Sequence, residues 1–572
     1  MSENPEVNVA EAEATPITIG ISFGNSNSSI AFTSPDGKAE VIANEDGDRQ
    51  IPSVLSYLTG DEFHGQEARN QLVRNAENTV AYFRDFLGKS FAEIDPTHSH
   101  ASAHPVDADG KPAFKVKEKD NAPASTLSVN EITSRHLRRL VTSAADFLGK
   151  PVKSAVVTVP TDFSEAQRAA LIKSAKAADL EILQTIHEPV AAVLSYSAKE
   201  NHQPEDKTIL VCDLGGTRCD TAIVAVRGGM YTILATAHDY ELGGFKLDEV
   251  LVEHFAKEFI KKHKSDPRTN SRALAKLKLE SEAVKRTLSI ATSAPLAVDS
   301  LHDGHDFHST INRLRFEMLS KKVFDDIVKL AEHTVQKAEL DLLDIDTVIL
   351  SGGTSHIPKI ATRLAQIFPV GTAIHAPATD TAALNPSELS AKGAAIQAAL
   401  IQEFDTEDIH QSEHPGVTVA PHLAAAIGVV VSPSADEAEG FHILLHPSTA
   451  LPARGKAEFT VSADGDVVVK IAEAERYIHV TKPEPVEKPA KEEKDEDEDE
   501  DSDEESDEEE EEEKREKKWK VKGVLAEARL QGVKKEDKVE VTVNAAVDGG
   551  LNIAARVVGT QNGVRGVIKP SA

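Results

Sequence analysis

Apolar residues follow two different patterns along this chain, and the pattern changes near residue 404. In residues 16–403, short apolar runs typical of strands alternate with longer segments in which apolar residues recur every three or four positions, as in amphipathic helices. We therefore expect an α/β fold for this region. The predicted strands are 156–159, 209–212, 221–226, 231–236 and 348–350, and the predicted helices are 129–148, 164–178, 247–262, 268–288, 315–340 and 388–403.

Beyond residue 416, apolar and polar positions alternate in short runs separated by turns, which is typical of antiparallel strands. The runs are 443–445, 457–461, 467–471, 477–480, 520–528, 538–544 and 551–555. This pattern predicts a small antiparallel β domain over residues 416–572. Residues 404–415 are polar and predict a linker between the two regions.

Acidic residues are concentrated in one segment inside this β domain. The formal net charge is -31, and residues 491–513 hold 19 acidic and 2 basic residues, which amounts to -17. Such a segment cannot bury enough apolar surface to fold, so we expect a disordered insertion at about 484–516, and likewise a disordered N-terminus at 1–15. The rest of the chain is only moderately acidic, which argues against broad attraction to nucleic acid. The basic stretch 514–522, which contains Trp519, either pairs with the acidic segment or contacts RNA.

No apolar run is long enough to cross a membrane, and residues 1–15 do not form a signal peptide, so we expect a cytoplasmic protein without a membrane contact. The two cysteines, Cys212 and Cys219, form neither a disulfide framework nor a CxxC pair. A buried apolar role is the favoured interpretation, and a redox role is the alternative. No metal site is predicted, because the spacing of His302, His305 and His308 in a glycine-containing hairpin matches no established site.

Three glycine turns, each beside an apolar strand, are the main candidates for chemistry. Their segments are 20–28 (Gly-Ile-Ser-Phe-Gly-Asn-Ser-Asn-Ser), 211–217 (Val-Cys-Asp-Leu-Gly-Gly-Thr) and 348–355 (Val-Ile-Leu-Ser-Gly-Gly-Thr-Ser). Glycine lets the backbone approach a ligand closely, and successive amides form a nest for phosphate oxygens. The first two turns lie between strands in opposite halves of the α/β region, which indicates a duplication into two similar lobes that face one cleft. The alternative is that all three are ordinary hairpins.

Further segments agree with the order of motifs in one family. They are 44–53 (Asn-Glu-Asp-Gly-Asp-Arg-Gln-Ile-Pro-Ser), 78–88, 156–160 (Val-Val-Thr-Val-Pro), 186–192 (Ile-His-Glu-Pro-Val-Ala-Ala), 242–244, 285–289 and 357–359. Together with the glycine turns, they resemble the actin-like ATPase superfamily and, within it, the 70-kilodalton heat-shock chaperones. The resemblance implies a two-lobed actin-like nucleotide-binding domain over residues 16–403 with ATP as its cofactor, followed by a truncated β-sandwich domain.

The resemblance also assigns the residues that would hold ATP. Phosphate contacts would come from Gly24, Asn25, Ser26, Gly215, Gly216, Thr217, Gly243 and Gly244, and nucleoside contacts from Glu282, Lys285, Arg286, Ser289, Gly352, Gly353 and His356. A carboxylate suits ribose hydroxyls, whereas cations and a serine offer adenine hydrogen bonds and a flat surface. The alternative for Lys285 and Arg286 is a solvated helix face.

Several positions at the phosphate end depart from the family's pattern. Ser22 replaces an aspartate, Arg84 replaces the lysine near the attacking water, and Arg218 replaces a threonine. A serine anchors a metal and its water less well than a carboxylate, and an arginine stays protonated and cannot act as a base. We therefore expect ATP binding with hydrolysis weak or lost, no catalytic residue, and at most a weakly anchored Mg²⁺. Two further departures are Asn25 for a threonine and His356 for an arginine, and the retained acidic residues are Glu188, Asp213 and Asp220.

The predicted linker and β domain depart from the family's pattern as well. Residues 404–415 lack the family's run of leucines, and no C-terminal helical lid is predicted. A β-sandwich without a lid would bind peptides loosely or be completed by an extended segment of another protein.

The combination of these departures resembles the atypical heat-shock subunits of fungal ribosome-associated complexes. That resemblance implies a co-chaperone rather than an enzyme, paired as a heterodimer with a zuotin-type J-domain protein and bound to the ribosome through that partner. The pair would stimulate a second, active heat-shock chaperone that acts on nascent polypeptides. Two alternatives stay open, an active ATP-hydrolysing peptide-binding chaperone and a small-molecule kinase on the same fold.

Overall fold

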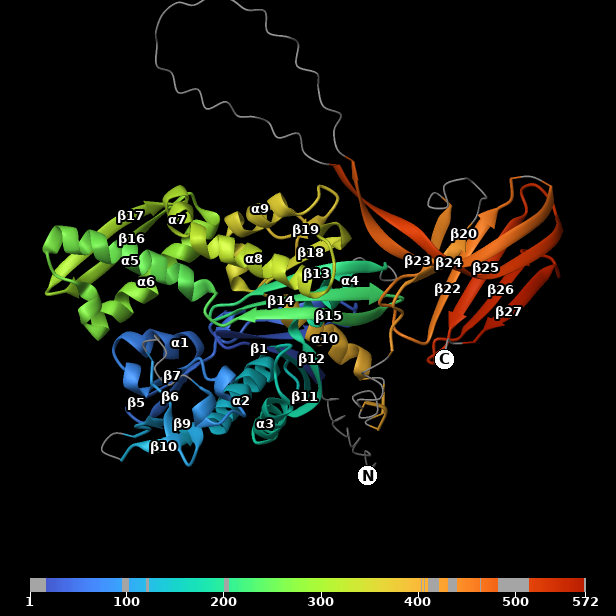
Figure 1. Cartoon of the computed structure of the whole chain (residues 1–572). Helices are drawn as coiled ribbons and strands as arrows, with labels where there is room; N and C mark the ends of the chain where they lie inside the picture. The colour runs from blue at the N-terminus through green and yellow to red at the C-terminus, as the bar shows by residue number, and fades with distance from the viewer. Residues whose placement is uncertain are drawn as a thin grey trace, which may run out of the picture. The chain divides into compact units, whose positions relative to one another are not determined.

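The computed structural model divides the chain into two compact units, residues 1–419 and 420–572, and Figure 1 shows their helices and strands. The structure describes residues 17–94, 102–119, 123–199, 205–402, 404–405, 407–409, 421–430, 440–462, 464–481 and 514–569. The predicted disordered N-terminus, most of the predicted linker and the greater part of the predicted acidic insertion lie outside these ranges.

The first lobe of unit 1 is built on a mixed six-stranded sheet in the order β12-β11-β1-β2-β3, with β4 paired to β2. Its strands are β1 (Ile17–Phe23), β2 (Asn27–Thr33), β3 (Ala39–Ile42), β4 (Ile51–Pro52), β11 (Val152–Val159) and β12 (Glu181–His187). Strand β1 pairs parallel to β11 and antiparallel to β2. Its alternate residues Ile19 and Ile21 are completely buried, which holds the strand in the middle of the lobe.

The second lobe repeats this arrangement. Its sheet has the order β15-β14-β13-β18-β19, with β13 (Lys207–Leu214), β14 (Cys219–Arg227), β15 (Met230–Asp239), β18 (Thr347–Ser351) and β19 (Ala373–His375). Strand β13 is antiparallel to β14 and parallel to β18, just as β1 is antiparallel to β2 and parallel to β11. The shared order and directions confirm the predicted duplication, and they put the turns after β1 and β13 at corresponding points.

Smaller sheets complete the two lobes. They are formed by β5 (Val54–Leu58), β6 (Asp61–His64) and β7 (Thr79–Ala81), by β8 (Val106–Ala108), β9 (Lys111–Val116) and β10 (Ser125–Ser128), and by the hairpin β16 (Ser293–His302) and β17 (His305–Asn312). This hairpin carries the three histidines considered above.

Helices flank the sheets of both lobes (Figure 1). They are α1 (Gly65–Asn70), α2 (Val129–Leu148), α3 (Glu165–Lys176), α4 (Glu188–Lys199), α5 (Gly244–His263), α6 (Ser271–Ile290), α7 (Arg313–Leu319), α8 (Lys321–Lys337), α9 (Pro358–Ile367) and α10 (Leu389–Ile401). Helix α2 has the predicted bounds, and α3 begins after Ser164, whose side chain forms a capping box with Gln167. Helices α5 and α10 also confirm predicted helices, whereas α4 and α9 had no counterpart in the prediction.

Two predicted helices are wrong in extent because polar residues interrupt them. The segment predicted as one helix over 315–340 is two, since α7 ends at Leu319 and α8 begins at Lys321 after Ser320. The segment predicted from 268 begins with a one-turn 3₁₀ helix, Pro267–Thr269, and α6 starts only after Asn270, whose side chain accepts a hydrogen bond from the Ala273 amide. The other 3₁₀ helices of the described chain are Gln71–Val73, Ala76–Asn78, Arg84–Phe86, Phe91–Glu93, Leu342–Asp344 and Gly353–His356.

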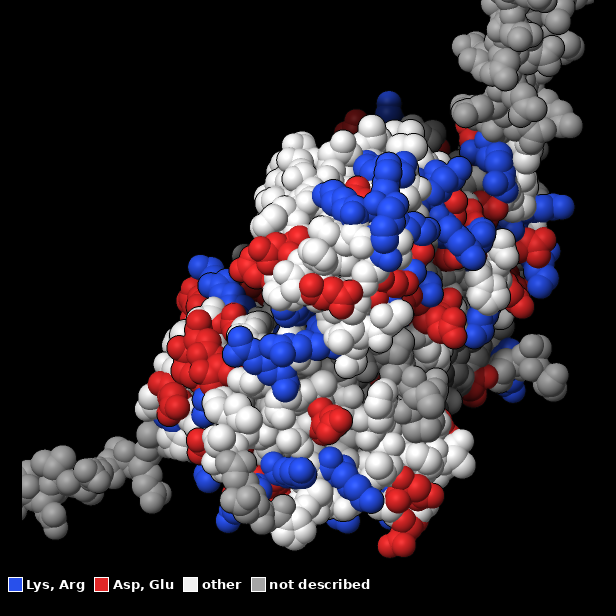
Figure 2. Space-filling view, turned by 90° about the vertical axis from the view of Figure 1, so that its left-hand side faces the viewer, with Lys and Arg blue, Asp and Glu red and all other residues white. Residues whose placement is uncertain are grey.

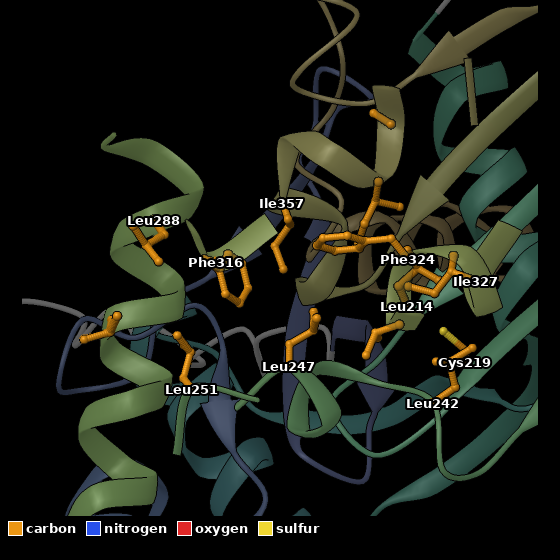
Figure 3. Close-up of a cluster of buried hydrophobic side chains, with 14 of the residues drawn as sticks. Leu214, Cys219, Leu242, Leu247, Leu251, Leu288, Phe316, Phe324, Ile327 and Ile357 are labelled. Carbon is orange, nitrogen blue, oxygen red and sulfur yellow. The ribbon is translucent and has the colours of Figure 1, made fainter. Parts of the chain in front are cut away.

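Helices α5 to α8 and the sheet of the second lobe share one hydrophobic core, part of which Figure 3 shows. Leu247 and Leu251 of α5 face Leu288 of α6 there. Both cysteines belong to this core and are completely buried, and burial raises the pKa of the Cys212 thiol to about 12. The apolar interpretation of the cysteines is therefore confirmed, because a buried thiol that stays protonated is unreactive.

Helix α10 packs so closely against β1 and α4 that their backbones are in van der Waals contact. A Cβ atom on Gly20 would lie 2.2 Å from the Ala395 amide nitrogen, and one on Gly393 would lie 1.9 Å from the Ala191 carbonyl oxygen. Only glycine permits these approaches. Helix α10 thereby ties the first sheet to α4, which packs on the second sheet.

Unit 2 contains two four-stranded antiparallel sheets, in the orders β21-β20-β23-β24 and β22-β25-β26-β27. Their strands are β20 (Ala426–Val430), β21 (Phe441–Leu445), β22 (Ala453–Thr460), β23 (Gly465–Thr481), β24 (Lys514–Val533), β25 (Lys538–Ala545), β26 (Leu551–Val557) and β27 (Gly563–Ile568). Residues of both sheets form one core, which includes Val429, Ile471, Leu530, Val541 and Ile553. The described residues from 421 onward contain no helix.

Two sequence predictions are wrong in this unit. The runs 467–471 and 477–480 belong to one continuous strand, β23, because it pairs along its whole length with β24. Strand β24 begins at Lys514, so the last three positions of the predicted insertion at 484–516 are strand instead. The basic stretch that contains Trp519 is likewise strand, where Trp519 pairs with Arg476.

Charged side chains of both signs are interspersed on the face of the molecule shown in Figure 2. Ion pairs join such charges within the chain, and Arg135 contacts Glu62, Glu118 and Glu131. Pairing of this kind keeps the surface free of a strong field of one sign. No helix of the described chain is long and apolar enough to span a membrane.

Candidate functional site

A cleft of about 870 Å³ opens between the two lobes of unit 1. The turns after β1, β13 and β18 reach it from three sides, and α6 contributes one wall. Of the residues that the sequence singled out, those that line it are Ser22, Gly24, Asn25, Ser26, Arg84, Glu188, Asp213, Gly215, Gly216, Thr217, Arg218, Asp220, Lys285, Arg286, Ser289, Gly352, Gly353 and His356. Three others, Gly243, Gly244 and Glu282, are not among the lining residues.

The turns after β1 and β13 touch each other across the cleft. The Asn25 Nδ2 amide donates a hydrogen bond of 3.1 Å to Thr217 Oγ1. A Cβ atom on Gly216 would lie 2.4 Å from Ser26 Oγ, so a side chain there would displace the Ser26 hydroxyl. The Ser26 hydroxyl is itself buried and has no hydrogen-bond partner among the described residues. Since an unpaired buried hydroxyl is costly, it indicates a polar ligand at this point.

Gly243 and Gly244 support the second turn from behind. The Gly244 amide donates to the Gly215 carbonyl oxygen at 2.9 Å, and a Cβ atom on Gly243 would lie 2.6 Å from the Gly216 carbonyl oxygen. Thr354 Oγ1 donates to the same Gly215 oxygen at 2.8 Å. These contacts engage the carbonyl groups of the second turn. The Gly215 amide donates to the Arg218 carbonyl oxygen at 3.0 Å, which leaves the amides of Gly216 and Thr217 for an anion.

A buried chain of hydrogen bonds holds the first turn, and the sequence prediction missed it. Ser53 Oγ donates to the Gly24 carbonyl oxygen at 2.8 Å, Ser28 Oγ lies 3.0 Å from Ser53 Oγ, and His136 Nε2 lies 3.0 Å from Ser28 Oγ. This series of hydrogen bonds ends at the Gly24 carbonyl oxygen, which can only accept. Ser53 therefore donates to that oxygen, Ser28 donates to Ser53, and His136 donates to Ser28 through Nε2. Burial lowers the pKa of His136 to about 3, so the ring is neutral. The signal was available in the serine at the end of segment 44–53, but nothing marked His136.

The wall formed by α6 is arranged differently from the expectation. Lys285 Nζ donates to the Gly244 carbonyl oxygen and to Asp248 Oδ2, each at 2.8 Å. The Glu282 carboxylate accepts a hydrogen bond from Arg69 of α1. It accepts a second one, of 2.8 Å, from Arg286 Nη2. Glu282 thus links the two lobes through Arg69, a cleft residue that the sequence prediction missed. The lysine lines the cleft while its ammonium group supports the start of α5.

His356 lines the cleft together with Ser289 of α6. His356 Nε2 lies 3.0 Å from Ser387 Oγ, and burial lowers the pKa of this histidine. The ring is therefore neutral and cannot supply the charge of an arginine. Gly352, at φ 82°, requires glycine, because a Cβ atom would also lie 2.4 Å from the Leu214 carbonyl oxygen.

Arg84 is buried at the phosphate end of the cleft, with 4% of its surface exposed. Its Nε donates to Asp85 Oδ1 at 2.8 Å and its Nη1 to Glu188 Oε1 at 3.2 Å, and a further bond reaches the Phe23 carbonyl oxygen at 3.3 Å. Three hydrogen bonds donated from one rigid plane thus hold the side chain. The single guanidinium charge balances one of the two carboxylates, and the group does not release a proton at neutral pH.

Arg218 is buried on the opposite side, with 6% of its surface exposed. Its Nε donates to Asp220 Oδ2 at 2.7 Å, and its Nη2 bonds Asp220 and, at 2.9 Å, Asp162 Oδ1. Its guanidinium carbon lies 4.5 Å from the centre of the Tyr240 ring. Asp220 also faces His238, whose Nδ1 lies 2.8 Å away. The retained Asp220 is therefore engaged by this chain's own cation.

Glu188 and Asp213 are two further acidic groups of the cleft, which Asp48 also lines. Burial raises the pKa of both, and the neighbouring charge of Asp220 raises that of Asp213 further, while Arg84 and Arg218 act in the opposite direction. Asp213 forms no ion pair with the described residues. The phosphate end thus combines two fixed guanidinium groups with one free carboxylate.

Two duplicated lobes around a cleft lined by three glycine turns are the architecture of the Hsp70 nucleotide-binding domain. The family model of the Hsp70 protein matches residues 18–413, and the chain belongs to the Hsp70 family of chaperones.

Three of its relatives show how far the similarity extends. The chain is 46% identical over 487 residues to a heat shock protein 70 homolog of Schizosaccharomyces pombe, which covers 84% of this chain and 85% of that protein. It is 42% identical over 549 residues to the ribosome-associated complex subunit SSZ1 of Saccharomyces cerevisiae, which covers 96% of this chain and 99% of that protein. It is 32% identical over 455 residues to a ribosome-associated molecular chaperone of the same yeast, which covers 79% of this chain and 71% of that protein.

The Hsp70 family binds ATP with Mg²⁺, and the cleft suits the two ligands differently. ATP fits, because the cleft volume, the glycine turns and the unpaired Ser26 hydroxyl all suit a phosphate chain. One group of three potential metal ligands exists in the described part of the chain, Asp162, Asp220 and His238, with ligand atoms within 4.8 Å of one another. A divalent cation does not fit this group, because Arg218 already bonds both carboxylates.

Proposed function

We propose that this chain is an atypical Hsp70 co-chaperone that binds ATP and hydrolyses it weakly or not at all. Gly24, Asn25 and Ser26 would bind the phosphates from the first lobe, and Gly215, Gly216 and Thr217 from the second. The nucleoside would lie between α6 and the turn after β18, where Arg286, Ser289, Gly352, Gly353 and His356 line the cleft. ATP would supply a charged phosphate chain that links the two lobes.

The observation that carries the proposal is the pair of locked arginines at the phosphate end. Phosphoryl transfer depends on positioning the nucleophile and on neutralising charge that develops during the reaction. Arg84 is held by Asp85 and Glu188, and it cannot accept a proton from water. Ser22 supplies only a hydroxyl at the end of β1. Loss of one positioned group costs roughly 10²- to 10³-fold in rate, whereas binding rests on many backbone contacts and is reduced less.

ATP bound without turnover would serve as a structural ligand. Only the folded cleft binds it, so ATP would stabilise unit 1 by mass action. The contact of Asn25 with Thr217 and the link from Arg69 to Glu282 already join the lobes. A bound phosphate chain would add contacts of the same kind, and would hold the lobes in one relative position.

Unit 2 would act as a β-sandwich substrate domain without a helical lid. Its two sheets share one core, and its described residues from 421 onward are without helices. Edge strands of such a domain offer unpaired N–H and C=O groups to an extended peptide. We propose that this unit binds a nascent polypeptide loosely or is completed by a segment of a partner.

The proposed setting is the ribosome in the cytoplasm. The similarity to the ribosome-associated complex subunit of Saccharomyces cerevisiae extends over 96% of this chain and supports membership of such a complex. We propose a heterodimer with a zuotin-type J-domain protein that reaches the ribosome through that partner and stimulates a second, active heat-shock chaperone. The alternative is an active peptide-binding chaperone with its own ATP cycle, which the retained Glu188 and Asp213 in the cleft favour.

Affinity purification from native cytosol, followed by ribosome sedimentation at low and high salt, tests this setting. We expect a stoichiometric J-domain protein in the eluate at both salt concentrations, and sedimentation with ribosomes at low salt. Depletion of that partner should release the chain from the ribosome. Recovery as a lone monomer that turns over ATP would support the alternative instead.

A further inference from the structure

The group formed by Asp162, Asp220 and His238 has the composition of a cation site, and its centre is taken by an arginine. The three residues come from different segments, since Asp162 follows β11, Asp220 lies in β14 and His238 in β15. Their ligand atoms lie within 4.8 Å of one another, and two carboxylates at such a distance repel each other unless a positive charge lies between them. The Arg218 guanidinium supplies that charge through bonds to both carboxylates.

Three features make Arg218 a permanent part of this group. The side chain is buried, its planar fork matches the carboxylates of Asp220 and Asp162, and its flat face lies on the ring of Tyr240. The Tyr240 hydroxyl in turn donates to Asp162. A small hydrated cation could enter only by displacing a guanidinium that is bonded on its edges and packed on its face.

The other residues at the phosphate end provide few ligands for a cation. Ser22 provides a hydroxyl where β1 ends, and Glu188 is paired with Arg84. Asp213 forms no ion pair with the described residues, and both Arg84 and Arg218 act on it electrostatically. Mg²⁺ prefers carboxylates, water and phosphate oxygens around it, and two guanidinium groups nearby repel it.

We infer that Arg218 takes the place of a divalent cation in this cleft, so that the chain binds nucleoside triphosphate without a metal ion. The inference rests on the proposed ATP binding. Arg218 lines the cleft, and its Nη1 forms no hydrogen bond with the described residues, which leaves this donor for a phosphate oxygen. A triphosphate without a metal ion leaves its oxygens exposed. A guanidinium binds such oxygens through directed N–H donors.

Isothermal titration of the full-length protein with ATP, in excess Mg²⁺ and in excess EDTA, measures this directly. We expect the two dissociation constants to agree within about threefold. Mn²⁺ titration without nucleotide, followed by electron paramagnetic resonance, should detect no tightly bound ion in the native protein. This second readout depends on the cation site alone.

Two variants should make the cleft bind a metal ion, each by a different change. Arg218→Thr removes the guanidinium and uncovers Asp162 and Asp220, so it should bind Mn²⁺ and lose more than about tenfold in ATP affinity in EDTA. Ser22→Asp leaves the buried group intact, so it should fold even if the first variant does not, and it should bind ATP more tightly in Mg²⁺ than in EDTA. Arg268→Thr is the matched control, because it removes an arginine from the carboxylates of Asp266 and Glu253 outside the cleft.

The possible results separate this inference from the proposed function. A native protein that binds ATP in Mg²⁺ but loses more than about tenfold in EDTA overturns the role of Arg218 and leaves ATP binding intact. An Arg218→Thr protein that folds yet stays indifferent to EDTA and Mn²⁺ overturns it as well. Absence of ATP binding under both conditions refutes the proposed function, and this inference with it.

Discussion

In the proposed function, single residues at the phosphate end separate ATP binding from hydrolysis. Arg84 and Arg218 keep the positive charge that a nucleotide requires, but both are bonded to carboxylates in a fixed orientation. A guanidinium stays protonated at neutral pH, so neither can take a proton from water. We therefore expect these substitutions to reduce hydrolysis more than ATP binding.

Restoring two groups should restore part of the chemistry. In the double variant Ser22→Asp with Arg84→Lys, a carboxylate returns to the end of β1 and a smaller cation replaces the locked guanidinium. Since one positioned group is worth roughly 10²- to 10³-fold, we expect the single-turnover rate of ATP hydrolysis to rise by about tenfold or more. Ser22→Asn with Arg84→Lys, which has the same shape without the charge, is the control. A folded, ATP-binding double variant with an unchanged rate would show that other groups limit hydrolysis.

His136 should make the stability of unit 1 fall in mild acid. Its folded pKa of about 3 lies below the usual value of 6.5, so between these values the unfolded chain binds more protons and unfolding is favoured as pH falls. Each pKa unit corresponds to about 1.4 kcal/mol, which predicts a loss of about 2 kcal/mol between pH 7 and pH 5. In urea unfolding at both pH values, His136→Gln should lack this loss, whereas His308→Gln on the exposed strand β17 should keep it. Equal losses in both variants would contradict the assignment.

At the scale of elements, the chain positions its cleft through close helix packing. Helix α10 rests on β1 at Gly20 and on α4 at Gly393, where backbones touch. The strand β1 ends in the first turn, and α4 begins with Glu188 at the phosphate end. Packing of α10 therefore determines how the acidic group of α4 and the first turn lie relative to each other.

A methyl group at Gly393 should disturb this packing. In Gly393→Ala the new Cβ atom would lie 1.9 Å from the Ala191 carbonyl oxygen, so a backbone must move. Overpacking of this kind typically costs about 1–3 kcal/mol, which a urea unfolding curve of the full chain resolves. Gly371→Ala is the control, because no atom lies within 4 Å of its Cβ position. A change in Gly393→Ala no larger than in the control would mean that α10 and α4 adapt freely.

Elements in which apolar residues recur with a clear period were predictable from the sequence, and elements without such a period were not. Helix α2 has one apolar face and was predicted to the residue, and Ser164 with Gln167 marked the start of α3. Helix α4 was missed because it is buried on most sides and therefore has no polar face to set a period. Strand β23 was split in the prediction because acidic residues at 473 and 475 interrupt its apolar alternation where it leaves the core of unit 2.

The site was predictable to the extent that backbone turns define it. The three glycine turns and the departures at Ser22, Arg84 and Arg218 all lie in the cleft. Side-chain pairing was not predictable, since it depends on distant segments. The bonds of Arg218 to Asp162, and of Glu282 to Arg69, join residues 56 and 213 positions apart. The same holds for His136, which supports the first turn from a helix 108 residues after Ser28.

At the scale of the whole molecule, the proposed ATP site lies in unit 1, and unit 2 is a separate compact unit. A ligand that binds only the folded cleft adds about 2.7 kcal/mol at one hundred times its dissociation constant. In calorimetry we expect ATP to raise the unfolding temperature of unit 1 and leave that of unit 2 unchanged. Adenosine, which lacks the phosphates, should have a smaller effect. Equal shifts of both transitions would contradict an ATP site confined to unit 1.

The most direct test of the central claim is a single-turnover experiment with radiolabelled ATP and excess purified protein. The nucleotide is recovered from the protein at successive times and separated into ATP and ADP. We predict that bound nucleotide is recovered as ATP over many minutes without a partner, and that the protein remains saturated. Rapid conversion to ADP, with several turnovers per minute when ATP is in excess, would contradict the account.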